Sequence, residues 1–133
     1  MENQIHYATS NDLVAIKEKI RSDESLFIGE ITGSEIRQLQ DYLTAVSQVF
    51  LFPQRSYTVD GYYDWMRDLG WLDKDGYVLI IHDYKNFLCQ DISSKNEVID
   101  GFARVILPFW EDEVTEVVVG GKAKSFMVYL VVE

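Results

Sequence analysis

The hydrophobic positions of this chain change their period several times, and each change predicts a helix or a strand. Residues 10–21 place apolar side chains along one side of a helix, and residues 26–31 form a short apolar run that predicts a strand. Apolar positions recur at helical spacing from residue 34 to residue 50, after Thr32 and Glu35, which have the form of a capping box. The first fifty residues therefore predict a helix, a strand and a second helix.

The middle of the chain predicts a third helix followed by a buried strand. Pro53 ends the second helix, and Thr58 can cap a third helix that runs to about Leu69 and stops at Gly70. Residues 77–81 are apolar without interruption, which is typical of a strand buried on both faces of a parallel sheet.

The C-terminal third predicts one more helix and a final strand. Ser94 can start the helix, and Pro108 ends or kinks it. Residues 125–132 are rich in β-branched and aromatic side chains, which favour a strand. Residues 116–119, followed by two glycines, can add a hairpin partner to that strand. The side chains expected to face the core from the last helix are Val98, Phe102, Val105 and Ile106.

Strands separated by helices imply right-handed crossovers. We therefore expect an α/β fold with a small parallel β-sheet of about three strands packed with helices, an extra N-terminal helix and a C-terminal hairpin. A chain of 133 residues and 15.4 kDa suits a single domain. In this interpretation residues 1–25 are an N-terminal extension and residues 26–133 are the core.

Composition and charge narrow the classes of partner. The chain carries 22 acidic and 12 basic side chains, for a formal net charge of -10. Direct binding of nucleic acid is not expected, because it requires clustered Lys and Arg, whereas an acidic surface attracts cationic partners. The single Cys89 precludes an internal disulfide and suits a reducing compartment. Without a signal peptide or an apolar segment of membrane length, the expectation is a cytoplasmic protein that is monomeric when free.

The third predicted helix carries the most informative pattern. Asp60, Asp64 and Asp68 follow one another at intervals of four residues, so each lies one helical turn above the last. Like charges at this spacing destabilise a helix by about 0.2–0.5 kcal/mol per pair, and Arg67 offsets only part of this. A solvated acidic face is the commoner explanation, but a row of carboxylates can also imitate consecutive phosphates. The apolar side of the same helix is made by Tyr62, Trp65, Met66 and Leu69.

The order of these segments is more specific than any one of them. The strand at 26–31 and the helix at 34–50 precede Phe-Pro, a loop with a tyrosine, and the pattern Asp-x-x-aromatic-Asp-x-Leu/Met, in which Met66 fills the last position. The run Asp68-Leu69-Gly70-Trp71-Leu72 then leads into the next strand. In these features the chain resembles the barstar family of ribonuclease inhibitors, residue by residue over roughly residues 26–87.

The resemblance implies an inhibitor that is not an enzyme, needs no cofactor or metal, and binds a basic nuclease one-to-one. In the family, two aspartates and the aromatic residue between them dock into the nuclease active site. By alignment these residues are Asp60, Asp64 and Tyr63, with Asp64 as the anchor. The family's last helix adds an acid, and the alignment places Arg104 at that position. Further partner-binding candidates are Arg67 and Asp68, where the family continues the contact surface, and Tyr57 as an interface aromatic.

Two functions on this scaffold remain open. One is inhibition of a ribonuclease by blocking its cationic active site, as a toxin-immunity protein would do. The other is a binding module that recognises another basic protein, such as a DNase-type toxin, without inhibiting a ribonuclease.

Enzyme and metal chemistry are favoured least. An enzyme would use Cys89 with His82 or His6, or His82 with Asp83, but a lone cysteine is more often a buried apolar residue. Residues 73–76 resemble the start of a calcium loop that lacks the required Gly and Glu, so we expect a turn there.

Overall fold

A computed structural model of the chain describes residues 3–133. Over these residues four strands form one fully parallel sheet in the order β1-β4-β3-β2. The sequence predicted about three strands, and the additional strand is β1 in the N-terminal extension, which pairs with β4. The strands are β1 (Ile5–Ala8), β2 (Leu26–Thr32), β3 (Gly76–His82) and β4 (Ser125–Val131).

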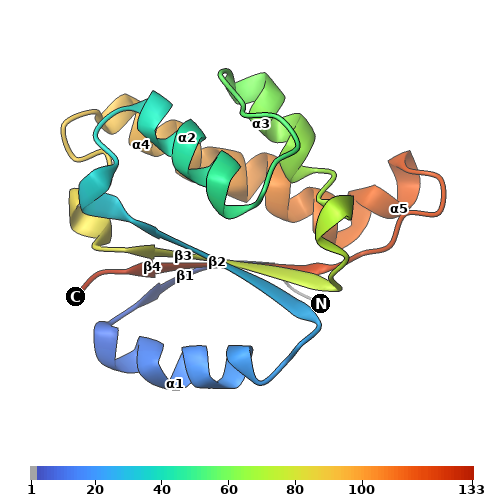
Figure 1. Cartoon of the computed structure of the whole chain (residues 1–133), viewed down its shortest axis with the longest axis horizontal. Coiled ribbons are helices and arrows are strands. Elements are labelled where there is room, and N and C mark those ends of the chain that lie inside the picture. Colours follow the sequence, from blue (N-terminus) through green and yellow to red (C-terminus); the bar gives the residue numbers. More distant parts are fainter. Residues whose placement is uncertain (1–2) are drawn as a thin grey trace.

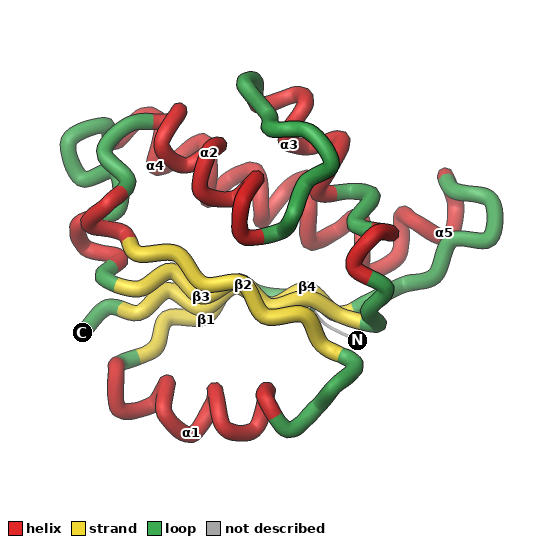
Figure 2. The backbone as a smooth tube through the Cα atoms, in the orientation of Figure 1, coloured by secondary structure: helices red, strands yellow, loops and turns green. Residues whose placement is uncertain are grey.

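The direction in which the chain crosses the sheet determines which face each helix covers. From β1 the chain crosses the whole sheet to β2, and it then returns through β3 to β4. Because crossovers between parallel strands are right-handed, this reversal places the helices before and after β2 on opposite faces. Figures 1 and 2 show α1 (Ser10–Arg21) alone on one face and the other helices on the second. The helices of the second face include α2 (Leu39–Val49), α3 (Val59–Met66) and α4 (Ile92–Gly101).

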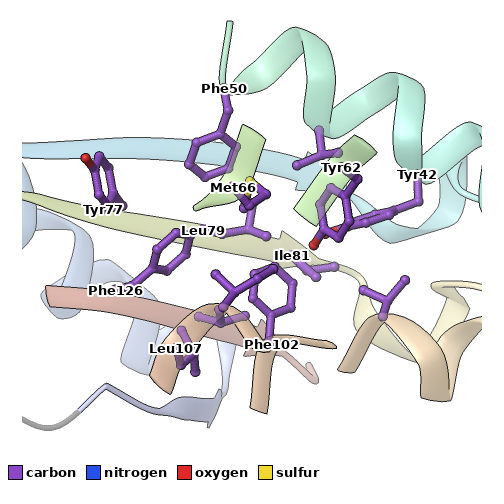
Figure 3. Close-up of a cluster of buried hydrophobic side chains, with 14 of the residues drawn as sticks. Tyr42, Phe50, Tyr62, Met66, Tyr77, Leu79, Ile81, Phe102, Leu107 and Phe126 are labelled. Carbon is purple, nitrogen blue, oxygen red and sulfur yellow. The ribbon is translucent and has the colours of Figure 1, made fainter. Parts of the chain in front are cut away.

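The main core lies between the sheet and the layer formed by α2, α3 and α4. Strand β3 is central, and its residues from Gly76 to Ile81 are all buried, which confirms the predicted buried strand. In Figure 3, Tyr62 and Met66 of α3 point into this core together with Phe50 and Phe126. The burial of α3 on one side therefore determines which of its side chains face solvent.

The second predicted helix begins later than expected. Residues Gly33–Glu35 form a single 3-10 turn, and α2 starts at Leu39. Ile36 between them is extended and buried, and its carbonyl accepts a hydrogen bond from the Leu88 N–H at 2.9 Å. In a helix that started at residue 34, the Ile36 carbonyl would accept a hydrogen bond from within the helix, but here it is bonded to Leu88. No helix therefore starts at residue 34, and the predicted capping box of Thr32 and Glu35 is wrong. The box is formed by Gln38 and Asp41.

The sequence predicted that Pro108 ends or kinks the last helix, and the structure shows that the helix does not end there. The helix begins at Ile92, where Asp91 accepts a hydrogen bond from the Ser94 N–H, and it continues past the proline. It widens into two π-helical segments and ends as α5 (Val114–Val117). A wider turn relieves the clash between a proline ring and the preceding turn, which explains why the helix persists. The π-helical segments are Phe102–Ile106 and Phe109–Glu113, and of the predicted inward residues Val105 is only half-buried.

The predicted C-terminal hairpin is also wrong. Residues 116 and 117 belong to α5, and a turn follows in which the Gly121 N–H bonds to the Val118 carbonyl at 2.9 Å. Gly120 has a φ of 75°, a conformation that favours glycine. The two glycines therefore shape a turn between a helix and β4, where the sequence suggested a turn between two strands.

Helices α2 and α3 are joined by a buried pair of tyrosines. The hydroxyl oxygens of Tyr42 and Tyr62 are 2.6 Å apart, and both side chains are almost fully buried (Figure 3). Burial raises the pKa of Tyr62 well above its usual value, so the pair remains neutral and one hydroxyl donates to the other.

We expect Tyr42→Phe to lower the free energy of unfolding by about 1–3 kcal/mol, because it leaves the Tyr62 hydroxyl buried without its partner. Changing both residues to Phe is expected to cost less than the sum of the two single changes, since no unpaired hydroxyl remains. Urea denaturation of the four proteins measures both quantities. Equal midpoints for Tyr42→Phe and wild type would contradict the expectation.

Candidate functional site

Helix α3 begins with a side-chain cap. Thr58 accepts a hydrogen bond from the Gly61 N–H at 3.1 Å, as the sequence predicted. Ser56, two residues earlier, is buried, and its N–H bonds to the Ser47 hydroxyl of α2 at 3.1 Å. The entry to α3 is thus attached to the neighbouring helix.

The loop before the cap holds Tyr57 in place although its side chain is 67 % exposed. The Arg55 guanidinium carbon lies 4.0 Å from the centre of the Tyr57 ring, and the guanidinium donates to the Thr44 hydroxyl. The Gln40 amide donates to the Tyr57 carbonyl at 3.0 Å. Tyr57 is therefore an exposed aromatic side chain on a braced loop, a combination suited to a protein interface.

The other end of α3 is fixed from the last helix. The helix ends at Met66, and the Trp110 indole N–H donates to the Met66 carbonyl at 2.9 Å in a buried position. Leu69 adopts a left-handed conformation, with φ of 56°, and is fully buried. The predicted continuation of the helix to Leu69 is therefore wrong, because these contacts turn the chain inward after Met66. Of the expected apolar side, Tyr62, Met66 and Leu69 are buried, whereas Trp65 is only half-buried.

Asp60 and Asp64 lie on the exposed side of α3. The Asp64 side chain is 76 % exposed and forms an ion pair with Arg67 at 3.3 Å. Exposed ion pairs at this spacing contribute less than about 1 kcal/mol, so this pair is easily exchanged for a partner's cation. Both carboxylates are turned away from the core, as the sequence predicted for a binding surface.

Asp68 differs from the other two aspartates. It lies two residues beyond the end of α3, and its carboxylate accepts a hydrogen bond from the Gly70 N–H at 3.1 Å. The predicted row of three stacked acids is therefore two acids on the helix and one in the turn after it. Asp68 is exposed and still lies near Asp64, since both line one open depression.

Tyr63 lies between α3 and α4. A Cβ atom at Gly101 of α4 would lie only 2.5 Å from the Tyr63 hydroxyl, so the glycine makes room for the ring. Burial raises the pKa of the Tyr63 phenol, and the negative charges of Glu97, Asp60 and Asp100 raise it further. Acids of both helices thus act on the same ring.

The sequence did not predict the two acids of α4 as part of the site, because the alignment places Arg104 at the position of the family's acid. Glu97 and Asp100 are exposed and three residues apart, and Gly101 follows them. Two acids at helical spacing beside a glycine could have indicated an acidic helix face in the sequence. Their position beside Tyr63 follows only from the packing of α4 against α3.

The residues considered for catalysis lie elsewhere. His82 is bonded through Nε2 to a Glu30 oxygen at 2.7 Å, and Lys17 donates to the same carboxylate at 2.8 Å. Burial raises the pKa of Glu30, but these bonds outweigh it and hold the pKa below its usual value.

Cys89 is exposed, contrary to the expectation of burial, and lines a depression with Arg37. Within residues 3–133, no three His, Cys, Asp or Glu side chains are grouped to hold a metal ion, and no helix could span a membrane.

The protein is thus a small α/β protein in which the acidic helix α3 is anchored to the core on one side and exposed to solvent on the other. The family model described as Barstar (barnase inhibitor) matches residues 26–120. Because the match covers more than half of the chain, this protein belongs to the barstar family. At the level of the family its role is inhibition of, or immunity to, a barnase-like ribonuclease, and the family's members are inhibitors, not enzymes.

The match runs from the start of β2 to the turn before β4, so it includes α3 and α4 but neither β1 nor α1. A comparison with curated proteins and one with solved structures each returned no match.

We expect Glu97→Gln to lower the pKa of the Tyr63 phenol, because it removes a negative charge that disfavours the phenolate. A pH titration followed by NMR with ¹³C-labelled tyrosine measures this value, and the Tyr63 signal is assigned by its loss in Tyr63→Phe. Glu18→Gln, an equal charge change on the exposed side of α1, is the control and should leave the titration unchanged. An unchanged midpoint in Glu97→Gln would show that Glu97 does not act on the Tyr63 phenol.

Proposed function

We propose that this protein inhibits a cationic ribonuclease by inserting the exposed side of α3 into the enzyme's active site. The observation that carries the proposal is the division of α3 into a buried side and a side that presents Asp60 and Asp64 to solvent. Carboxylates one helical turn apart, with about 5–6 Å between their Cβ atoms, can occupy positions that successive phosphates of RNA take among basic side chains.

In this proposal the partner-binding residues have different roles. Asp64 is the anchor, because its ion pair to Arg67 is exposed and can be replaced by a stronger pair to the enzyme. Asp60 binds a second cationic group, and Tyr63 covers the space between them. Arg67 and Asp68 border the contact on the side of the turn, and Tyr57 borders it on the side of the loop.

Charge supports the same partner. The acids of α3 are joined by Glu97 and Asp100 of α4, and the whole chain has a formal net charge of -10. An acidic surface that meets a basic one speeds association, and salt weakens the effect because the Debye length is only about 8 Å at 0.15 M. The proposed complex therefore forms rapidly and in a salt-dependent manner.

The proposal extends to the biological setting. The protein would act as an immunity protein that forms a one-to-one complex with a nuclease toxin in the cytoplasm of the cell that makes it. Residues 1–133 would act as one domain, an idea supported by the pairing of β1 with β4 across the chain. The separate possibility of a DNase-type partner is decided by the experiment below.

We expect Asp64→Asn to weaken the complex at least about a hundredfold and Asp60→Asn about tenfold, because each leaves a basic group of the enzyme without its counter-charge. Folding should be unchanged, since both side chains are exposed. The probes are purified barnase, which the family description names, and a panel of other cationic ribonucleases. Inhibition constants at two salt concentrations measure the effect.

Glu18→Gln is the matched control, because it removes one negative charge from α1 on the opposite face of the sheet. If Asp60→Asn with Asp64→Asn leaves the affinity for an inhibited nuclease unchanged, the assignment of the site is wrong. If no ribonuclease is inhibited but a cationic DNase is bound through Asp64, the protein is the alternative binding module.

A further inference from the structure

We propose that Gly101 of α4 is a positioning residue for the nuclease contact. Because it has no side chain, it leaves a notch in α4 that holds the Tyr63 ring in the orientation in which the ring meets the enzyme. The inference rests on the proposed function and adds to it a buried residue that acts only through Tyr63.

Tyr63 is the predicted partner-binding residue that packs most closely against the body of the protein. It is half-buried, whereas the other five are exposed, namely Tyr57, Asp60, Asp64, Arg67 and Asp68. Aromatic side chains near the centre of an interface often carry a large share of the binding energy, and a side chain that is already held in place loses little conformational entropy on binding. The packing that orients the Tyr63 ring therefore bears directly on affinity.

No backbone requirement explains a glycine at residue 101. Its φ of -60° and ψ of -42° are those of an ordinary right-handed helix. The chain continues without interruption from α4 into the π-helical segment that follows, and glycine destabilises a helix relative to alanine. A glycine in such a place indicates that packing against another element requires it.

The packing requirement comes from Tyr63. The three atoms that a Cβ at residue 101 would approach most closely all belong to that side chain, with the hydroxyl oxygen at 2.5 Å, Cε1 at 3.0 Å and Cζ at 3.2 Å. These distances are too short for an undisturbed contact. Since the atoms are at the far end of a side chain, a methyl group at residue 101 would displace the ring and leave the backbone of α4 in place.

The space beneath the ring does not allow it to move inward. The centre of the Tyr62 ring lies 5.4 Å from that of Tyr63, and Tyr62 is held by its hydrogen bond to Tyr42. The hollow that these rings line together with Val98 has a volume of only about 10 Å³, which is room for at most one water molecule. An added methyl group therefore pushes the Tyr63 ring outward.

An outward movement of the ring takes place within the acidic site. Burial raises the pKa of the Tyr63 phenol, and the negative charges of Glu97, Asp60 and Asp100 raise it further, so acids of both helices lie near the ring. Because the cationic groups of the enzyme must approach these acids, a protruding ring keeps them at a greater distance. The notch at Gly101 prevents this.

The test makes Gly101→Ala in two proteins, wild type and Tyr63→Ala, and measures binding to every nuclease that wild type inhibits among barnase and the cationic ribonucleases of the panel. In wild type the change is expected to raise the dissociation rate about tenfold, while the association rate stays within about twofold because no charge changes. In Tyr63→Ala the same change is expected to alter the dissociation rate less than about twofold, because the ring through which Gly101 acts is absent.

Ser93→Ala is the matched control, because it adds a helix-favouring alanine at an exposed position on an earlier turn of α4. It is expected to leave both rates unchanged. NMR of the free protein with ¹³C-labelled tyrosine follows the ring directly, and the Tyr63 signal should move in Gly101→Ala and stay in place in Ser93→Ala. Urea midpoints show whether each variant folds.

Each outcome decides the inference. A loss of affinity that is confined to proteins with Tyr63, together with a moved Tyr63 signal, supports it. If Asp64→Asn weakens the complex but Gly101→Ala dissociates like wild type, the notch is not used in binding and the proposed function stands.

The inference is overturned if Gly101→Ala weakens binding equally in Tyr63→Ala, leaves the Tyr63 signal in place, or prevents folding, because the glycine then does not act by positioning the ring. If wild type inhibits no nuclease, the proposed function fails and the inference fails with it.

Discussion

The fixed position of α3 depends on contacts outside that helix. With 8 residues, α3 is too short to be stable by itself, so its geometry must come from the structure around it. Ser56 and Tyr62 attach its first half to α2, and the Trp110 indole holds its last carbonyl. These bonds keep one side of the helix in the core, and as a result two carboxylates are displayed on a rigid base despite their mutual repulsion.

Much of this arrangement is predictable from the sequence because it depends on local patterns. The uninterrupted apolar run of β3 and the Thr58 cap are short-range signals, and the structure confirms both. The outward direction of Asp60 and Asp64 follows from helical spacing once the buried side is known. The resemblance to the barstar family extends further than the residue-by-residue similarity suggested, since the family match reaches residue 120.

The features that were not predicted depend on contacts between distant segments. The Leu88 N–H bonds to the Ile36 carbonyl, and α2 therefore starts later than predicted. No local sequence pattern indicates this contact. A proline predicts that a helix ends or kinks, and the sequence does not indicate that this helix accommodates Pro108 by widening into π-helical turns. Glu97 joins the acidic site only because α4 packs beside α3 at a glycine. Strand β1 has only 4 residues, too few for a clear sequence pattern, and it is extended because it pairs with β4.

The position of β4 inside the sheet constrains how the chain reaches its native state. It is the last strand in the sequence, yet it lies between β1 and β3. While a ribosome is still making the protein, residues 5–8 therefore have no strand to pair with, and they must wait until residues 125–131 have emerged. Contacts between such distant parts of a chain slow folding. The sheet on which α3 rests can therefore be closed only once residues 125–131 are available, well after α3 itself has been made.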